Sequence, residues 1–140
     1  MKGLDTNVLV RYLTEDEPRQ AAVAAKEIAG ATKAGEKLVV QPIVLCEMVW
    51  VLESAYGVGK REILDVLERI LRTAQFEIPE KDIVWRSLDD YRVGRGDFSD
   101  YLLGRWNESA GAPVTLTFDK VLGGNPRLTT ELPQEWDSDR

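Results

Sequence analysis

Acidic residues stand beside apolar segments at four points of this chain, and that arrangement limits the folds the chain can adopt. The four segments are Leu4-Asp5-Thr6-Asn7, Leu45-Cys46-Glu47-Met48, Asp97-Phe98-Ser99-Asp100 and Thr117-Phe118-Asp119. Burying an unpaired carboxylate costs several kcal/mol. When such acids lie on elements of the core, the simplest explanation is that they come together around a divalent cation, which neutralises their charge. The pattern therefore predicts metal-dependent chemistry.

The length of 140 residues, with 44% apolar and 30% charged residues, predicts a single domain over 1–140, with 131–140 as a loose tail. No stretch approaches the run of about 20 apolar residues that crosses a membrane. An aspartate at position 5 argues against a signal peptide. The single Cys46 cannot form an internal disulfide, which suits a reducing compartment. We therefore expect a cytoplasmic domain.

The chain contains no histidine, which removes several classes of catalytic site. Ser-His-Asp and Cys-His arrangements are impossible, and a zinc site of the usual kind is excluded. Catalysis must use carboxylates, hydroxyls, Lys or Arg, or a metal. The net charge of −6 does not by itself suggest a nucleic-acid partner. If nucleic acid binds, metal ions and a local basic patch must overcome the repulsion.

Short apolar runs alternate with helical patterns along the chain. Strands are expected at 1–4, 37–40, 76–78, 114–119 and 127–132, and helices at 6–13, 19–34, 42–56, 61–73, 80–93 and 99–110. The helix at 42–56 is apolar on nearly every side, which predicts that it is largely buried. The alternation predicts an α/β fold with a mainly parallel sheet flanked by helices. Sites in such sheets form beyond the carboxyl ends of strands, where Asp5 and Asp119 are expected.

Each acid also has a purely structural explanation. Asp5 can cap a helix, and Asp97 with Asp100 resembles a capping pair at a helix start. Asp119 can begin a turn, and Glu47 can be exposed or paired with an arginine. The joint placement of these acids favours a site for Mg²⁺ or Mn²⁺, which prefer oxygen ligands. Other acids are expected on the solvated surface, namely Glu15, Asp16, Glu17, Asp137 and Asp139.

The same segments resemble the four acidic motifs of PIN domains, and the size resembles the VapC toxins of bacterial type II toxin–antitoxin modules. The similarity runs from Leu4 to about Leu132. It implies a PIN-like three-layer sandwich and a Mg²⁺-dependent endoribonuclease, in which Mn²⁺ is expected to substitute for Mg²⁺. The matching acids are Asp5, Glu47, Asp100 and Asp119, with Asp97 as an accessory ligand. Polar positions lining the same pocket are matched by Thr6, Asn7 and Thr117.

The resemblance further implies an RNA substrate, a homodimer and a cognate VapB-like antitoxin. Trp50 and Tyr56 are hypothesised to lie near the antitoxin groove, the alternative being that Trp50 belongs to the core. The candidates for RNA contact are Arg11, Arg92 and Arg95, followed by Arg86 and Arg105. The alternative for each arginine is an ordinary surface ion pair.

Other classes of function fit less well. A non-enzymatic Mg²⁺-binding signalling or interaction domain would also gather acids at strand ends. Such domains open with adjacent acids and carry a lysine beyond a later strand, whereas here Asp5 stands alone and Lys120 directly follows Asp119. A scaffold without chemistry would not need all four acids. A structure-specific DNA nuclease needs more chain than is present.

Overall fold

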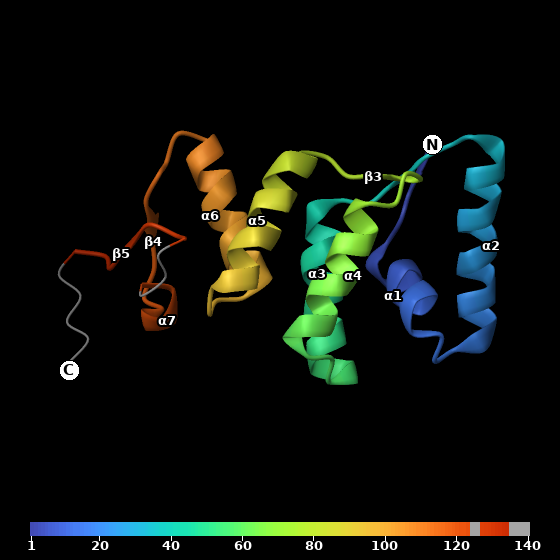
Figure 1. The fold of residues 1–140 in the computed structure, drawn as a ribbon, viewed down its shortest axis with the longest axis horizontal. Coiled ribbons are helices and arrows are strands. Elements are labelled where there is room, and N and C mark those ends of the chain that lie inside the picture. Colours follow the sequence, from blue (N-terminus) through green and yellow to red (C-terminus); the bar gives the residue numbers. More distant parts are fainter. Residues whose placement is uncertain (124–126, 135–140) are drawn as a thin grey trace. The chain divides into compact units, whose positions relative to one another are not determined.

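The computed structural model describes residues 1–123 and 127–134. The chain divides into two compact units, Met1–Lys81 and Asp82–Arg140, and each is described here by itself (Figure 1). Asp137 and Asp139, which were predicted to lie on the surface, are outside the described residues, as is most of the predicted tail. In the described part of the chain, no helix combines the length and apolar character needed to cross a membrane.

The N-terminal unit is built on three short parallel strands. They are β1 (Lys2–Gly3), β2 (Leu38–Val39) and β3 (Phe76–Glu77), in the order β1-β2-β3. Two helices precede β2, namely α1 (Thr6–Thr14) and α2 (Pro18–Ala34), and two precede β3, namely α3 (Pro42–Tyr56) and α4 (Lys60–Leu71). Because the strands are parallel, their carboxyl ends share one edge. Both α1 and α3 begin just beyond that edge.

Prolines and glycines set the boundaries of these helices. Pro18 and Pro42 occupy the first turns of α2 and α3, where a missing N–H costs no hydrogen bond. Gly35 and Gly57 end the same helices with φ of 70° and 62°, a left-handed conformation that glycine adopts without strain. These four residues explain why the predicted bounds of both helices agree with the structure to within one residue.

The prediction that the helix at 42–56 is largely buried is wrong. Met48 and Leu45 are fully buried, but Ile43 is 64% exposed and Trp50 is 70% exposed. Glu47 is exposed as well. These three exposed residues are spaced four and three apart, so they share one face of α3. The helix packs with its other face, and an almost continuous apolar sequence concealed which face that would be.

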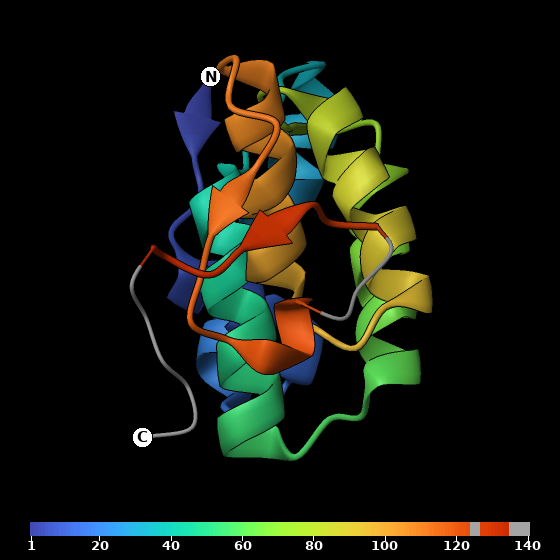
Figure 2. The ribbon, with the colours of Figure 1, turned by 90° about the vertical axis from the view of Figure 1, so that its left-hand side faces the viewer.

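The described residues of the C-terminal unit form two longer helices, one short helix and a small parallel ladder. Its elements are α5 (Lys81–Val93), α6 (Phe98–Ser109), β4 (Thr115–Leu116), α7 (Lys120–Gly123) and β5 (Thr130–Glu131). Thr115 pairs with Thr130, and Figure 2 shows these two strands side by side in orange and red. The carboxylate of Asp90 on α5 is buried and accepts bonds of 2.7 and 2.9 Å from Arg105 on α6. This pair joins the two helices.

The described elements confirm the predicted α/β class with parallel strands. The expected strand at 114–119 is shorter than predicted, and α7 was not predicted at all. In that region the polar Thr115 is buried, whereas Leu116 and Phe118 are 64% and 59% exposed. The strand ends at Leu116, and Asp119 further along caps α7 with its side chain.

Candidate active site

Asp5 lies between β1 and α1 and is the N-cap of α1. Its Oδ1 accepts a 2.7 Å hydrogen bond from the backbone N–H of Thr6. Among the described residues, Oδ2 accepts no hydrogen bond, and the side chain is exposed. The capping explanation and the metal explanation are therefore compatible, because they use different oxygen atoms.

A hydrogen bond between side chains joins α1 to Glu47. The hydroxyl Oγ1 of Thr6 donates to Oε1 of Glu47 over 3.2 Å. Thr6 is only 9% exposed, so its position is fixed by packing. Burial raises the pKa of the neighbouring Cys46 thiol to about 11, and the negative charge of Glu47 adds to this increase. Asp5 and Glu47, hereafter the N-terminal acid set, are thus linked through Thr6.

Three further acids cluster at two helix starts of the C-terminal unit. Asp97 is the N-cap of α6, and its N–H donates to Oδ2 of Asp100 over 2.9 Å. Oδ1 of Asp119 accepts from the N–H groups of Val121 and Leu122 at the start of α7. The N–H of Asp119 donates to Thr117 Oγ1 over 3.0 Å. Asp97, Asp100 and Asp119 are hereafter the C-terminal acid set.

The acids of this set repel one another. Burial raises the pKa of Asp100, and the charges of Asp97 and Asp119 raise it further, against the lowering effect of the hydrogen bond from the Asp97 N–H. A raised pKa means that the charged form is disfavoured. A cation placed near these three carboxylates would remove the repulsion, so their chemistry fits a hard divalent metal.

A buried tyrosine holds the loop that precedes α6. The hydroxyl of Tyr101, a residue only 1% exposed, accepts a 2.9 Å hydrogen bond from the N–H of Gly96. A Cβ at Gly96 would lie 2.8 Å from Leu122 Cδ2, so glycine permits the close approach of this loop to α7. The contacts of this loop with Tyr101 and Leu122 were not predicted from the sequence. The one signal available in the sequence is the pair of glycines in Gly94-Arg95-Gly96, and it does not show what the loop packs against.

The structure brings the predicted ligands together as two sets, one in each unit. Among residues 1–123 and 127–134, no group of three or more Asp, Glu, Cys or His is close enough to hold a metal ion. The role of the five acids as metal ligands therefore stays a prediction. Of the predicted site wall, Thr6 contacts Glu47, Thr117 contacts Asp119, and Asn7 is exposed on α1.

Arg11, a predicted RNA contact, is held within a polar network. Its Nη1 donates to Asp16 Oδ1 over 3.2 Å and to the Tyr56 hydroxyl over 3.1 Å. Its Nε donates to Gln20 over 2.8 Å. The Tyr56 hydroxyl donates to Asp16 Oδ2 over 2.6 Å, and this bond is the largest cause of the lowered pKa of Asp16. The network ties the α1–α2 turn to the end of α3.

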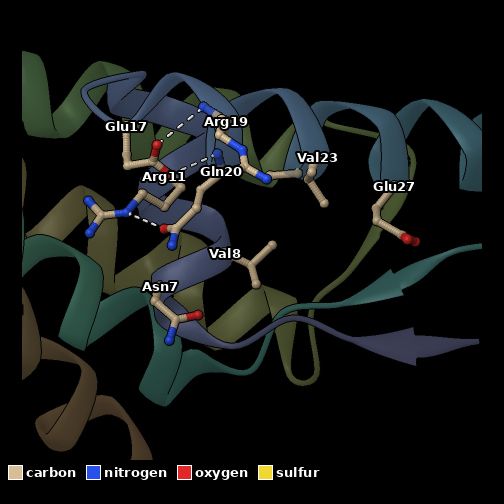
Figure 3. Close-up of a pocket in the computed structure, with 9 residues that line it drawn as sticks. Asn7, Val8, Arg11, Glu17, Arg19, Gln20, Val23 and Glu27 are labelled. Atoms are coloured by element: carbon tan, nitrogen blue, oxygen red, sulfur yellow. Dashed lines mark hydrogen bonds between the residues drawn. The ribbon is translucent and has the colours of Figure 1, made fainter.

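A groove of about 730 Å³ lies between α1 and α2. Figure 3 shows Arg11 reaching across it to Gln20. Charges of both signs line it, so it does not present a uniform surface to an anionic ligand. Its lining residues are Asn7, Val8, Arg11, Glu17, Arg19, Gln20, Val23, Ala24 and Glu27.

The remaining candidates divide by their surroundings. Arg92 and Arg95 are exposed just before the C-terminal acid set, and Arg86 is exposed on α5. Arg105 is bound to the buried Asp90. Trp50 is 70% exposed, so the alternative that it belongs to the core is wrong.

Comparison with known proteins shows the family of this chain. Residues 3–123 match the model of the PIN domain. The chain is also 28% identical over 120 residues to a VapC ribonuclease of Aquifex aeolicus (strain VF5), which covers 86% of this chain and 88% of that protein. The family model spans both acid sets and all four acidic motifs. The chain belongs to the PIN domain family.

Proposed function

We propose that this chain is a divalent-metal-dependent endoribonuclease and the toxin of a toxin–antitoxin pair. One observation carries the proposal. Within the described residues, none of the five acids of the two sets forms an ion pair with a lysine or arginine. The buried Asp90, by contrast, is paired with Arg105. Clustered acids that lack a cationic side chain suit an external cation.

Mg²⁺ is the proposed metal, and Mn²⁺ is expected to substitute for it, since both prefer oxygen ligands. Asp5, Glu47, Asp100 and Asp119 would hold the metal, with Asp97 as an accessory ligand. A divalent ion bound there would lower the pKa of a water molecule and offset the charge of a phosphodiester.

The chain itself supplies the positioning of these ligands. Thr6 fixes Glu47 by the hydrogen bond to Oε1, and the helix caps fix one oxygen each of Asp5 and Asp119. Thr117 holds the backbone at Asp119. Asn7 completes the polar wall beside Asp5. Such supporting groups determine where each ligand points, and their loss typically costs roughly 10–100-fold in metal affinity or activity.

RNA is the proposed substrate, in keeping with the VapC ribonuclease to which the chain is similar. With a net charge of −6, the protein needs both the metal and local cations to bind RNA. Arg92 and Arg95 are the proposed phosphate contacts, because they are exposed beside the C-terminal acid set. A VapB-like antitoxin and a homodimer complete the proposal.

Cleavage of a mixed cellular RNA pool by the purified full chain tests the proposed activity. We expect discrete fragments with Mg²⁺ or Mn²⁺, and intact RNA when EDTA is present. Discrete fragments that persist at full yield in EDTA would contradict a metal-dependent mechanism. Intact RNA with folded protein and either metal would contradict the ribonuclease itself.

A further inference from the structure

Trp50 is the largest exposed apolar side chain near the N-terminal acid set. It is 70% exposed, although burial of a tryptophan is among the most favourable contributions to a core. Its indole N–H has no hydrogen-bond partner among the described residues; only the backbone carbonyl of Trp50 is engaged, by Ser54. The ring is therefore mostly open to solvent and makes no hydrogen bond within the described residues.

The position of Trp50 relative to Glu47 is fixed by the helix. The two residues are three apart in α3, so their Cβ atoms lie roughly 5–6 Å from each other on one face. Glu47 is oriented by Thr6, and both side chains of the pair on α3 are exposed. The indole ring is thus close enough to the Glu47 carboxylate, a proposed metal ligand, for a single nucleotide to contact both.

We infer that Trp50 is a stacking platform for an unpaired base of the RNA, so that the substrate is single-stranded at the cleavage position. This inference rests on the proposed function. A planar ring can stack on any base, whereas a base inside a duplex is already stacked and cannot reach it. The exposed ring supplies the open aromatic face that such a contact needs. Its continuity with Glu47 favours RNA over a protein partner at this position.

Three substitutions at Trp50 separate stacking from general apolar contact. Trp50→Phe keeps an aromatic plane, Trp50→Leu keeps apolar volume without one, and Trp50→Ala removes both. Stacking on an aromatic side chain changes affinity by roughly tenfold for a single base. We expect Trp50→Ala and Trp50→Leu to raise KM about tenfold with kcat nearly unchanged, and Trp50→Phe to stay within about threefold of wild type.

The substrate is a single-stranded oligonucleotide that spans a cleavage position mapped in the cellular RNA pool, compared with the same sequence closed into a duplex. The full chain should cleave the duplex far more slowly. An abasic nucleotide is then placed in turn on each side of the cleaved bond. At one of these positions, it should slow cleavage by wild type about tenfold and leave the rate of Trp50→Ala unchanged. Ile43→Ala is the matched control, because Ile43 is 64% exposed one turn away on the other side of Glu47 and has no ring.

The inference is overturned if Trp50→Ala cleaves with the KM of wild type, or if Trp50→Leu equals Trp50→Phe. It is also overturned if Trp50→Ala changes the oligomeric state of the protein at the assay concentration, since the ring would then serve a contact between copies. Failure of the inference is distinguishable from failure of the proposed function. In the first case wild type cleaves the oligonucleotide and only the variants disagree, and in the second wild type leaves all RNA intact.

Discussion

At the scale of single residues, the acids combine structural and chemical roles by using different oxygen atoms. Asp5 caps α1 through Oδ1, and Asp119 caps α7 through Oδ1. Capping was predictable from the sequence, because an aspartate just before a helix commonly plays this role. The contact between Thr6 and Glu47 was not predictable, because the two residues are 41 positions apart. Only the tertiary structure brings them together.

Thr6→Val tests the importance of that contact. Valine matches the shape of threonine but removes the hydroxyl that orients Glu47. Loss of a group that supports a metal ligand typically lowers metal affinity roughly 10–100-fold. We therefore expect the Mg²⁺ concentration for half-maximal cleavage to rise by at least about tenfold.

Thr14→Val is the matched control for this experiment. The hydroxyl of Thr14 is on the same helix but bonds to the Val10 carbonyl and Asp16, away from Glu47. Its loss should leave the Mg²⁺ requirement unchanged. An unchanged Mg²⁺ requirement in Thr6→Val would show that Thr6 does not position a ligand.

At the scale of elements, local signals predicted helix ends better than they predicted helix faces. Proline and glycine fix the ends of α2 and α3 by backbone geometry alone. The buried face of α3 depends on what packs against it, and its apolar sequence does not reveal this. The four-residue α7 was missed because the side chain of Asp119, rather than any periodic pattern, begins it.

The pair of Asp90 and Arg105 should be the most sensitive polar contact between α5 and α6. The Asp90 side chain is 2% exposed, so Arg105→Met would leave a buried charge whose one remaining ion-pair partner among the described residues is Arg127, 3.8 Å away. Breaking a buried pair in this way costs about 3–5 kcal/mol. We expect a loss of that order in the free energy of unfolding, measured by urea denaturation.

The matched control is Lys37→Met, which breaks an ion pair with Glu77 whose two side chains are about half exposed. Such surface pairs contribute roughly 0–1 kcal/mol. Converting both Asp90 and Arg105 to apolar residues should recover much of the loss caused by Arg105→Met alone. Equal and small effects of Arg105→Met and Lys37→Met would contradict a structural role for the buried pair.

The network around Asp16 predicts a specific pH dependence. The pKa of Asp16 is lowered, first by the hydrogen bond from Tyr56, then by Thr14, and also by the charge of Arg11. A lowered pKa in the folded state stabilises the fold above the ordinary value of 3.8, and this stabilisation is lost as the pH falls through the folded-state pKa.

Asp16→Asn should therefore be less stable than wild type at neutral pH, and the difference should shrink as the pH falls below about 4. Unfolding by urea at a series of pH values measures this difference. Tyr56→Phe, which removes the leading hydrogen bond, should reduce it. A difference between wild type and Asp16→Asn that stays constant down to about pH 2 would show that Asp16 has no special environment.

At the scale of the whole molecule, net charge opposes the proposed substrate. The balance of 18 basic and 24 acidic residues gives −6, so a few exposed arginines must carry the phosphate contacts. Arg95→Ala should weaken RNA cleavage and reduce the slope of log affinity against log salt by roughly one. Arg61→Ala is the control, because Arg61 is exposed on α4 and belongs to no acidic motif. Equal salt slopes for Arg95→Ala and wild type would remove Arg95 from the RNA contact.

The order of the four acidic motifs was readable from the sequence, and the PIN family match over residues 3–123 confirms the family that those motifs indicated. The sequence could not show that the acids form two sets within two compact units. That grouping depends on tertiary contacts. Thr6 forms a hydrogen bond with Glu47, and the charges of Asp97 and Asp119 act on Asp100.

The measurement that tests the central claim most directly is the cleavage rate of Asp5→Asn and Asp119→Asn, together with their stability. Asparagine caps helices about as well as aspartate, so both variants should keep the fold while losing a charged ligand. Glu17→Gln is the control, because Glu17 caps α2 in the same manner but belongs to neither acid set. We predict near-native stability for all three, a wild-type rate for Glu17→Gln, and a loss of roughly 10²-fold or more for the other two. Wild-type rates in well-folded Asp5→Asn and Asp119→Asn would contradict the proposed role of these two carboxylates in cleavage.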